Sequence, residues 1–565
     1  MSRSRAREEL RGSSFARAAA VSHLADDYRA AARWLENKAG SWRIDDHTDV
    51  FFCDQVLRDL ARDLRQTEDA LNDSIVSQQR IESSRIIQLS NRLVWIFSAK
   101  GLTFERKQYI STPSDSNKAM NLNSFIALMG HRLKKVPTAE GVALRDASED
   151  EAPDLVIRDT PYLLTLDADS MLLRDYCLRL VYLLEQPGNE RVAVTQTPYS
   201  SYRGAPSRIE RLAAATTDIQ HVLHQGLTYY DATFWVGANA VIRKKALEDI
   251  VQVSAQDDKI VKTYIQDRTV IEDTESSVDL GMQGWHLVNY PERLSYSATP
   301  PDFGSLVVQR RCWANGGLLI VGKFLRQVRL RRNSSHPVRL AEFLLRVNYM
   351  MSIAWSSVGL IFLLFYPFDS RLLSLWVIAA AVPYFALMAD DLKRNGYHRS
   401  DILRIYGFNI VLLTVNLAGT VKSVQQGITN AKIPFARTPK VEDRTASPAL
   451  YVIMPWLIVV FSGLVLYSDI LSHNWWNAAF AGFNGIVTTW AIVSLVGVRN
   501  SLRDAIVGLI GWLYVPDRPR AVADVRGGSR PGDGRRGTDS YGWRERLYYG
   551  DRDLIFRSRL TGGRS

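Results

Sequence analysis

The chain has 565 residues, 46% of them hydrophobic and 23% charged, with a mean hydropathy of -0.11 and a formal net charge of +11. Much of the arginine flanks apolar segments, as in RLRRNSSHPVR (329–339), which favours a cytoplasmic membrane surface over a nucleic-acid partner. The three cysteines, Cys53, Cys177 and Cys312, have no Cys-x-x-Cys spacing and an odd total, so neither a disulfide framework nor a zinc site is indicated.

Residues 1–110 are expected to form a mainly helical N-terminal region. Segments such as YRAAARWLENKAG (28–40) and DQVLRDLARDLRQTEDAL (54–71) place opposite charges at i,i+4 spacing around apolar residues. This pattern is typical of a solvated helical surface and carries no evident chemistry.

Residues 111–340 are expected to form an α/β domain with a largely parallel sheet covered by helices. NSFIALMGHRL (123–133) and MLLRDYCLRLVYLLEQ (171–186) have helical patterns, whereas YLLTLDAD (162–169) and VAVTQTPY (192–199) resemble buried strands. FWVGANAVIRKKAL (234–247) is expected to be a strand that leads into a helix, which completes the alternation.

Residues 345–497 are expected to form an α-helical transmembrane region with a cytoplasmic loop near 421–448. Five apolar stretches approach the roughly 20 residues that a bilayer core requires, and they lie at 345–366, 371–389, 403–420, 449–471 and 475–497. An odd number of spans before the basic loop would place that loop outside the cell. We therefore expect 403–420, which contains Arg404, Asn409 and Asn416, to be re-entrant or interfacial.

Residues 498–565 are expected to form a basic, partly disordered C-terminal tail. RGGSRPGDGRRG (526–537) has the composition of a disordered segment. SLRDAIVGLIGWLY (501–514) is short for a span and suits the membrane surface.

Asp167 and Asp169 form the strongest local signal in the sequence. An apolar strand ends at these residues, so two carboxylates lie on the same side at the carboxyl edge of a sheet. Hard oxygen ligands at this edge suit a divalent cation bound to a diphosphate. The alternative is an ordinary turn or helix cap, in which aspartate is common.

Two further clusters follow along the chain. Glu272 and Asp273 precede an expected helix, where they act either as capping carboxylates or as a general base for an acceptor hydroxyl. In VVQRRCWANGG (307–317), guanidinium groups beside an indole suit a diphosphate and a sugar ring, or alternatively anchor the chain at a membrane interface. The residues concerned are Gln309, Arg310, Arg311 and Trp313.

These motifs, together with KAMNLN (118–123) and FWVGANAVIRKKAL, resemble the family 2 glycosyltransferases, especially the cellulose synthase, hyaluronan synthase and chitin synthase group. The family motifs are KAG-N-LN, DxD, TED and QxxRW on a GT-A fold, which is α/β and Rossmann-like, with membrane helices after the last motif. The resemblance runs from about 100 to 445 and includes IPFARTPK (433–440), which is similar to a loop near the active-site entrance of bacterial cellulose synthases.

The resemblance implies a role for each matching residue. Lys118 would contact the donor nucleotide, and Asp167 and Asp169 would hold the donor and its metal, either Mg²⁺ or Mn²⁺. Asp273, with Glu272 beside it, would be the catalytic base. Arg310 and Arg311 would bind the donor, and Gln309 and Trp313 would shape the acceptor site.

The implied reaction is transfer of a sugar from a nucleotide-diphosphate sugar, such as UDP-glucose or UDP-N-acetylglucosamine, to a growing polysaccharide with inversion. The implied location is the plasma membrane, with several spans, a cytoplasmic catalytic domain, a glycan acceptor, lipid contacts and a partner subunit for export. Nucleic acid is not an expected partner, because no basic stripe with interleaved aromatic residues is present.

The sequence departs from the family pattern in two places. Cys312 stands where QxxRW has arginine, which removes a donor for the leaving diphosphate. No strand and turn for the nucleotide base and no DDG-like acidic motif are found before Lys118, so the N-terminal part of the catalytic domain is expected to be missing. Two alternatives to a polysaccharide synthase therefore stay open: a single-addition transferase acting on a lipid-linked or surface acceptor, and a truncated or degenerate non-catalytic membrane partner.

Overall fold

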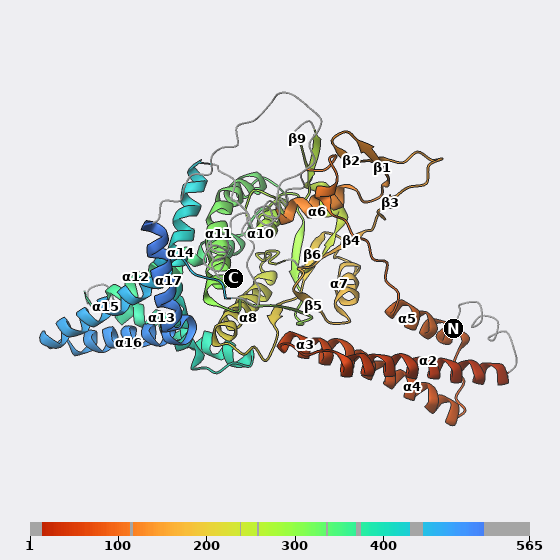
Figure 1. Cartoon of the computed structure of the whole chain (residues 1–565), viewed down its shortest axis with the longest axis horizontal. Coiled ribbons are helices and arrows are strands. Elements are labelled where there is room, and N and C mark those ends of the chain that lie inside the picture. The colour runs from red at the N-terminus through yellow and green to blue at the C-terminus, as the bar shows by residue number, and fades with distance from the viewer. Residues whose placement is uncertain are drawn as a thin grey trace, which may run out of the picture.

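The computed structural model describes residues 14–113, 117–237, 239–256, 259–269, 271–334, 337–368, 375–429 and 444–513. Figure 1 shows three parts along its long axis: an N-terminal helical bundle at one end, sheets with their covering helices in the middle, and long helices at the other end. The IPFARTPK segment and the tail from 514 onwards lie outside the described residues.

The N-terminal bundle, residues 14–96, has its own core. Leu24, Tyr28, Leu35 and Ala39 recur at helical spacing on one face of the first helix and are all buried. The Tyr28 hydroxyl donates to the carbonyl of Leu89 at 3.0 Å, which fastens the last helix to the first. The elements are α2 (Ser14–Ser41), α3 (His47–Phe51), η1 (Phe52–Arg58), α4 (Asp59–Val76) and α5 (Ser83–Ile96).

The central sheet has four strands in the order β11-β6-β8-β4. They are β4 (Tyr162–Thr165), β6 (Val192–Gln196), β8 (Ala240–Arg243) and β11 (His286–Asn289). β11 is parallel to β6, whereas β8 is antiparallel to both β6 and β4. The sheet is therefore mixed, and the expectation of a largely parallel sheet fails at β8, because this strand is inserted between β6 and β4 in the opposite direction.

Helices cover both faces of this sheet. Val241 packs against α7 (Tyr176–Leu184), whereas Ile242 packs in the cluster that contains residues of α6 (Lys118–Ala127), α9 (Lys244–Asp249) and α10 (Glu272–Met282). The expected helix over 171–186 begins only at Tyr176, because Met171 and Leu172 belong to β5 (Ser170–Leu172). The combination of an α/β region containing parallel strands with long apolar helices after it agrees with the expected fold class.

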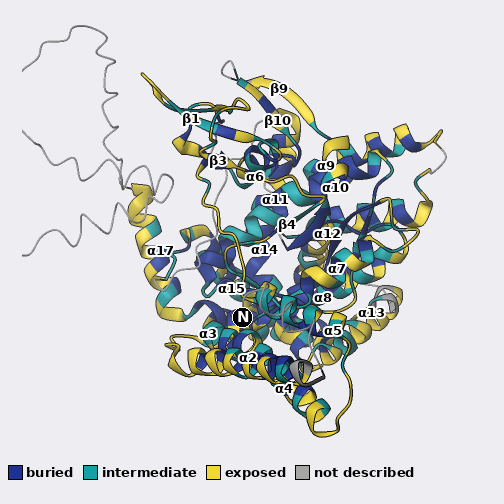
Figure 2. Ribbon diagram, turned by 90° about the vertical axis from the view of Figure 1, so that its right-hand side faces the viewer, coloured by how far each residue is buried: buried dark blue, intermediate teal, exposed yellow. Residues whose placement is uncertain are grey.

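Within the described ranges, three smaller sheets accompany the central one. β5 pairs with β12 (Ser295–Ser297), and β12 pairs with β7 (Tyr199–Ser201). The other two are β1 (Arg132–Thr138), β2 (Gly141–Asp146) and β3 (Leu155–Val156), and the hairpin β9 (Gln252–Gln256) with β10 (Lys259–Thr263). In Figure 2, β9 and much of β1 lie at the surface.

The remaining helices are α8 (Arg208–Tyr229), α11 (Phe303–Arg331), α12 (Leu340–Phe365), α13 (Leu375–Arg394), α14 (Asp401–Thr429), α15 (Ala449–Leu471), α16 (Trp475–Ala491) and α17 (Val498–Leu513), with the short turns η2 (Arg106–Gln108) and η4 (Ile492–Val496). Within the described residues, four helices are long and apolar enough to cross a membrane: Leu340–Phe365, Asp401–Thr429, Ala449–Leu471 and Trp475–Val496.

This set differs from the spans expected from the sequence in two segments. The helix over 401–429, expected to be re-entrant or interfacial at 403–420, has the length and composition of a span, whereas the helix over 371–389 does not meet both criteria among the described residues. Asn416 is buried within the protein, and Arg404 pairs with Asp401, so neither side chain extends as a lone polar group toward lipid.

The segment expected to form a cytoplasmic loop near 421–448 is helical over its first part. α14 continues to Thr429, and residues 430–443 lie outside the described part of the chain. The described part of the chain resumes at Arg444, whose guanidinium binds Asp504 of α17. The Thr445 N–H donates to Asp302 at 2.9 Å. Asp302 is the N-cap of α11, so the end of this segment is fastened to α11.

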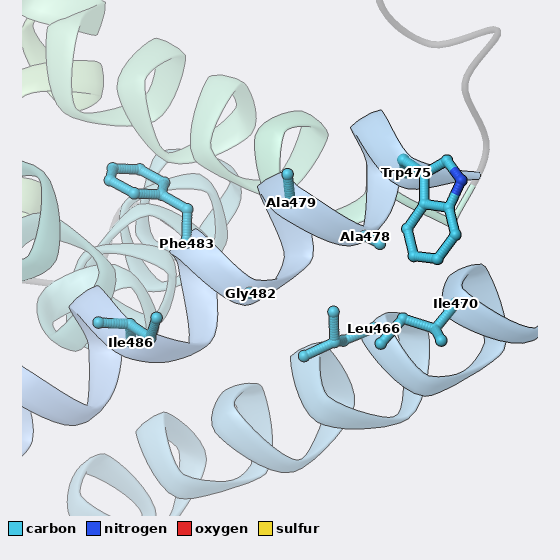
Figure 3. A pocket seen from close by; sticks show the side chains of 8 residues that line it. All are labelled: Leu466, Ile470, Trp475, Ala478, Ala479, Gly482, Phe483 and Ile486. Atoms are coloured by element: carbon cyan, nitrogen blue, oxygen red, sulfur yellow. The ribbon is translucent and has the colours of Figure 1, made fainter. Parts of the chain in front are cut away.

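A shallow apolar groove of about 500 Å³ lies between α15 and α16, away from the sheet (Figure 3). Leu466 and Ile470 form one wall, and side chains from Trp475 to Ile486 form the other. Its lining is apolar, as expected for helices that face lipid.

Gly317 tests the packing of α11. A Cβ atom at this position would collide with the main-chain carbonyl oxygen of Met350 in α12, so we expect Gly317→Ala to destabilise the protein by about 1–3 kcal/mol. Gly322 on the same helix has open space around its Cα, and Gly322→Ala should be neutral or stabilising by up to about 1 kcal/mol. Thermal unfolding of the purified protein in detergent measures both, and equal melting temperatures for the two variants would contradict this account of the packing.

Candidate active site

A cavity of about 2630 Å³ connects the sheet to the membrane helices. Its polar end is lined by Lys118, Asp167, Asp169, Glu272 and Asp273. Its other end is lined by aromatic residues of α12, α13 and α14, namely Trp355, Phe362, Trp376, Tyr384, Phe385 and Tyr406. The structure thus brings the predicted acidic residues and Lys118 together on one wall of a single space.

Lys118 is the cationic centre of the polar end. It is the first residue of α6, whose N-cap Asn117 accepts the Met120 N–H at 2.6 Å. Its ammonium lies 2.7 Å from Asp167 and 3.5 Å from Glu272. Burial lowers the pKa of Lys118, but the charges of Glu272 and Asp167 outweigh it, so the pKa lies above its ordinary value and the side chain stays charged.

Asp167 and Asp169 occupy the turn between β4 and β5. The turn follows a strand of the central sheet, as the sequence indicated, and the Asp167 carboxylate remains 41% exposed to the cavity. The Tyr202 hydroxyl donates to the main-chain carbonyl of Asp169 at 2.9 Å. The turn is therefore held from its far side while its carboxylates line the cavity.

Glu272 and Asp273 are the first two residues of α10, whereas the sequence prediction placed them just before the helix. Asp273 accepts the Gly237 N–H at 2.6 Å and the Thr274 N–H at 2.6 Å, so its carboxylate is fixed by two main-chain donors. Gly237 has φ +80, a conformation that side chains rarely adopt, and the ring of Tyr199 lies directly against it. Asp273 therefore does more than cap its own helix, because one of its donors comes from the β6–β8 side of the site.

Burial dominates the electrostatics of these two acids. It raises the pKa of Glu272 to about 7, with the neighbouring Asp273 charge as the next cause. Burial also raises the pKa of Asp273, although Lys118 and the N–H groups of Thr274 and Gly237 act in the opposite direction. A carboxylate with a raised pKa is a stronger base, which general-base chemistry at neutral pH requires.

α11 contributes Gln309, Arg310, Cys312 and Trp313 to the cavity lining, whereas Arg311 is not part of it. Arg310 donates to the Thr216 hydroxyl at 2.7 Å, and its guanidinium lies 4.7 Å from the ring centre of Trp313 and 5.6 Å from that of Phe408. Its Nε is buried and has no hydrogen-bond partner among the described residues. Burial lowers the pKa of Arg310 to about 10, so it remains a cation.

Arg310 therefore presents a buried positive charge to the cavity. Arg311, which the sequence prediction grouped with Arg310, does not line the cavity. An unmet donor on a buried guanidinium is costly unless a ligand accepts from it. Phosphate oxygens are suitable acceptors.

The sequence prediction missed Tyr199, Asn239 and Gly237. Tyr199 lines the cavity, and its phenol is close enough to Asp273, Asp167 and Arg310 to feel their charges, while burial is the main cause that raises its pKa. The Asn239 side chain accepts weakly from the Asp167 N–H at 3.5 Å. Their place directly after β6 and before β8 was the available signal, because loops at strand ends converge on such sites.

Asp167 and Asp169 could hold a divalent cation only together with ligands that the described residues do not supply, such as substrate phosphates and water. No group of three or more histidine, cysteine, aspartate or glutamate residues with metal-ligand placement occurs within the described ranges. A magnesium ion is commonly held by one or two carboxylates together with substrate phosphates and water. Two carboxylates that border an open cavity match that pattern.

Residues 162–388 match the family described as glycosyl transferase family group 2. The matched range contains both aspartates of the β4–β5 turn, the acidic start of α10 and the α11 cluster, but not Lys118. This match confirms the resemblance inferred from the motifs.

Curated relatives point in the same direction. Putative cellulose synthase 2 of Komagataeibacter xylinus is 24% identical over 175 residues, which cover 30% of this chain and 10% of the relative. Cellulose synthase 1 of Komagataeibacter xylinus and that of Novacetimonas hansenii are each 26% identical over 168 residues, 29% of this chain and 10% of each relative. The alignment thus spans about a tenth of the length of these relatives. The chain carries a family 2 glycosyltransferase domain with distant similarity to cellulose synthases over about 30% of its length.

Proposed function

We propose that this chain is a membrane-embedded synthase that transfers a sugar from a UDP-sugar to the end of a growing polysaccharide. The observation that carries the proposal is the continuity of the cavity, which holds the carboxylates around Lys118 at one end and aromatic rings between the membrane helices at the other. Aromatic faces suit stacking against the apolar faces of sugar rings. A polymer extended at the polar end would thus have a path along these rings.

Asp273 is the proposed general base. In the reaction, the acceptor hydroxyl oxygen forms a bond to the anomeric carbon of the donor sugar while the bond from that carbon to the diphosphate oxygen breaks. Asp273 takes the proton of the hydroxyl, and the nucleoside diphosphate leaves with the electron pair of the broken bond. The attack from the opposite face inverts the anomeric centre, and the fixed position of Asp273 between two N–H donors supports its role.

Lys118 and Arg310 are the proposed contacts for the donor. The Lys118 ammonium is already held among the carboxylates, and Arg310 offers a buried donor without a partner among the described residues. Asp167 and Asp169 would hold a Mg²⁺ or Mn²⁺ ion, which when bound neutralises charge on the diphosphate. Gln309 and Trp313, on the α11 face that lines the cavity, would contact the acceptor.

The extent of the cavity favours a polysaccharide synthase over a single-addition transferase. A single-addition transferase needs room for one acceptor end, whereas the aromatic lining extends over three helices, α12, α13 and α14. Product length measured by size-exclusion chromatography distinguishes a polymer from a single addition. The basic segments beside the apolar helices favour a cytoplasmic catalytic domain in the plasma membrane.

Asp273→Asn tests the base. We expect membranes that carry the chain to incorporate label from one of a panel of radiolabelled UDP-sugars with Mg²⁺ or Mn²⁺, and the variant to be about 10²- to 10⁴-fold slower because it cannot accept the proton. UDP binding should persist, since the side chain keeps its size.

Asp159→Asn is the matched control. Asp159 is an exposed aspartate paired with Lys244 and does not line the cavity, so its substitution should leave the rate unchanged. Full activity of Asp273→Asn would overturn the assignment of the base. No incorporation by the parent chain with any donor would instead favour the non-catalytic membrane partner.

Arg310→Ala and Arg311→Ala test the donor site as a pair. Losing a charge-assisted bond to the diphosphate should raise the KM for the UDP-sugar by about 10- to 100-fold in Arg310→Ala. Arg311 does not line the cavity, so its variant should change the KM by less than about threefold. Steady-state kinetics measures both, with thermal unfolding to check the fold, and equal effects of the two substitutions would contradict the assignment.

A further inference from the structure

The turn that carries Asp167 and Asp169 continues into the small sheet of β5, β12 and β7. Ser170, directly after Asp169, pairs with Ser297 of β12, and β7 forms the opposite edge of the same sheet. Figure 1 shows α3 of the N-terminal bundle next to β5. The bundle and the turn thus meet at this sheet.

Tyr202 joins the two. It follows β7, is 3% exposed, and its hydroxyl lies 2.9 Å from the carbonyl oxygen of Asp169 and 3.3 Å from that of Tyr296. A hydrogen bond to the main-chain carbonyl of Asp169 restricts the turn itself. The direction of the Asp169 side chain depends on that main chain, because the side chain projects from it.

Phe51, the last residue of α3, packs against the ring of Tyr202. Its ring centre is 5.1 Å from that of Tyr202 and 4.5 Å from that of Tyr296, and it is buried although it belongs to the bundle. Edge-on and tilted aromatic contacts at these separations are favourable beyond the area that they bury. The bundle therefore contributes directly to the position of the Tyr202 ring.

A second contact between the bundle and this segment lies just after β5. The Arg174 guanidinium, two residues after the strand ends, is 2.9 Å from the Asp63 carboxylate of α4, and Asp63 is also 2.7 Å from Arg92 of α5. The bundle therefore holds the segment after Asp169 at Arg174 as well as through Tyr202. Two independent contacts with the short segment 169–174 indicate that the bundle stabilises its position.

We propose that the N-terminal bundle is a positioning element for the cation and donor site, acting through Phe51 and Tyr202 on the Asp169 main chain. This inference rests on the proposed function, since it assigns the support of the proposed cation ligands. Holding the turn before the ligand arrives reduces the ordering cost of binding. Phe51, Asp63 and Tyr202 are positioning residues, because none is proposed to touch the substrate.

The test is binding of Mn²⁺ with UDP to the full chain in detergent, by isothermal titration calorimetry. Tyr202→Phe removes one hydroxyl and keeps the ring, and Phe51→Leu removes the ring that packs against it. Each substitution should weaken Mn²⁺–UDP binding about three- to tenfold. The double variant should bind with the same affinity as the single variant that has the lower affinity, because both substitutions act through one contact. Hydrogen exchange of the peptide 166–174 should become faster in both, while kcat at saturating donor changes by less than about twofold.

Trp95→Ala is the control within the bundle. Trp95 is 62% exposed on α5, so its loss should leave Mn²⁺–UDP affinity and exchange at 166–174 unchanged. Parent-like affinity of Tyr202→Phe, or an equal loss of affinity in Trp95→Ala, would overturn the inference. A parent chain that does not bind Mn²⁺–UDP would overturn the proposed function together with it, which distinguishes the two failures.

Discussion

The close packing of α11 against its neighbours is the constraint on which the rest of the structure depends. Side chains are absent at the points where α11 meets other main chains: a Cβ at Gly304 would collide with the carbonyl oxygen of Thr445, and one at Gly317 with that of Met350. Gly316 leaves room for Ile271, the residue directly before the acidic start of α10. One helix thus sets the position of the acidic start of α10, of α12 and of the segment that begins at residue 444.

α10 needs this support because it is lined with buried charge. Glu275 is 1% exposed and lies 3.3 Å from Lys323 of α11, and the same ammonium is 2.7 Å from Asp279. Such a network is poor evidence of stability by itself, since the desolvation cost offsets the attraction. It does favour one orientation of α10 against α11, because a rotation would separate Lys323 from both carboxylates and leave Glu275 with Arg268 as its ion-pair partner. That orientation places Asp273 beside Gly237 and the cavity.

The sequence alone indicated which local elements carry the proposed site residues, and the structure places these residues along one cavity. Asp167 and Asp169 follow an apolar strand and Asp273 lies at a helix start, but each motif was weak by itself, and the prediction, including Lys118, rested on the motifs occurring together in one order. The direction of β8 could not be predicted, because Ala240–Arg243 would be equally apolar in either orientation. The expectation for 403–420 came from the number of spans before the basic loop, whereas α14 has the length and composition of a span and Asn416 is buried in protein. Phe51 and Tyr202 are separated by about 150 residues and carry no sequence signal for their contact.

The ion pair between Lys118 and Asp167 has a consequence for how the site would fill. The Lys118 ammonium is not unpaired before a ligand binds, since it already forms ion pairs with two carboxylates. A cation at Asp167 would displace the ammonium, and a diphosphate would accept it, so the two arrivals assist each other through a single exchange of partners. Ligand affinity is then a difference between old and new ion pairs and not the sum of new ones. If the proposed function holds, such a site would favour the metal–nucleotide complex over either component alone, and comparing the binding of Mn²⁺, of UDP and of both together would show whether the exchange takes place.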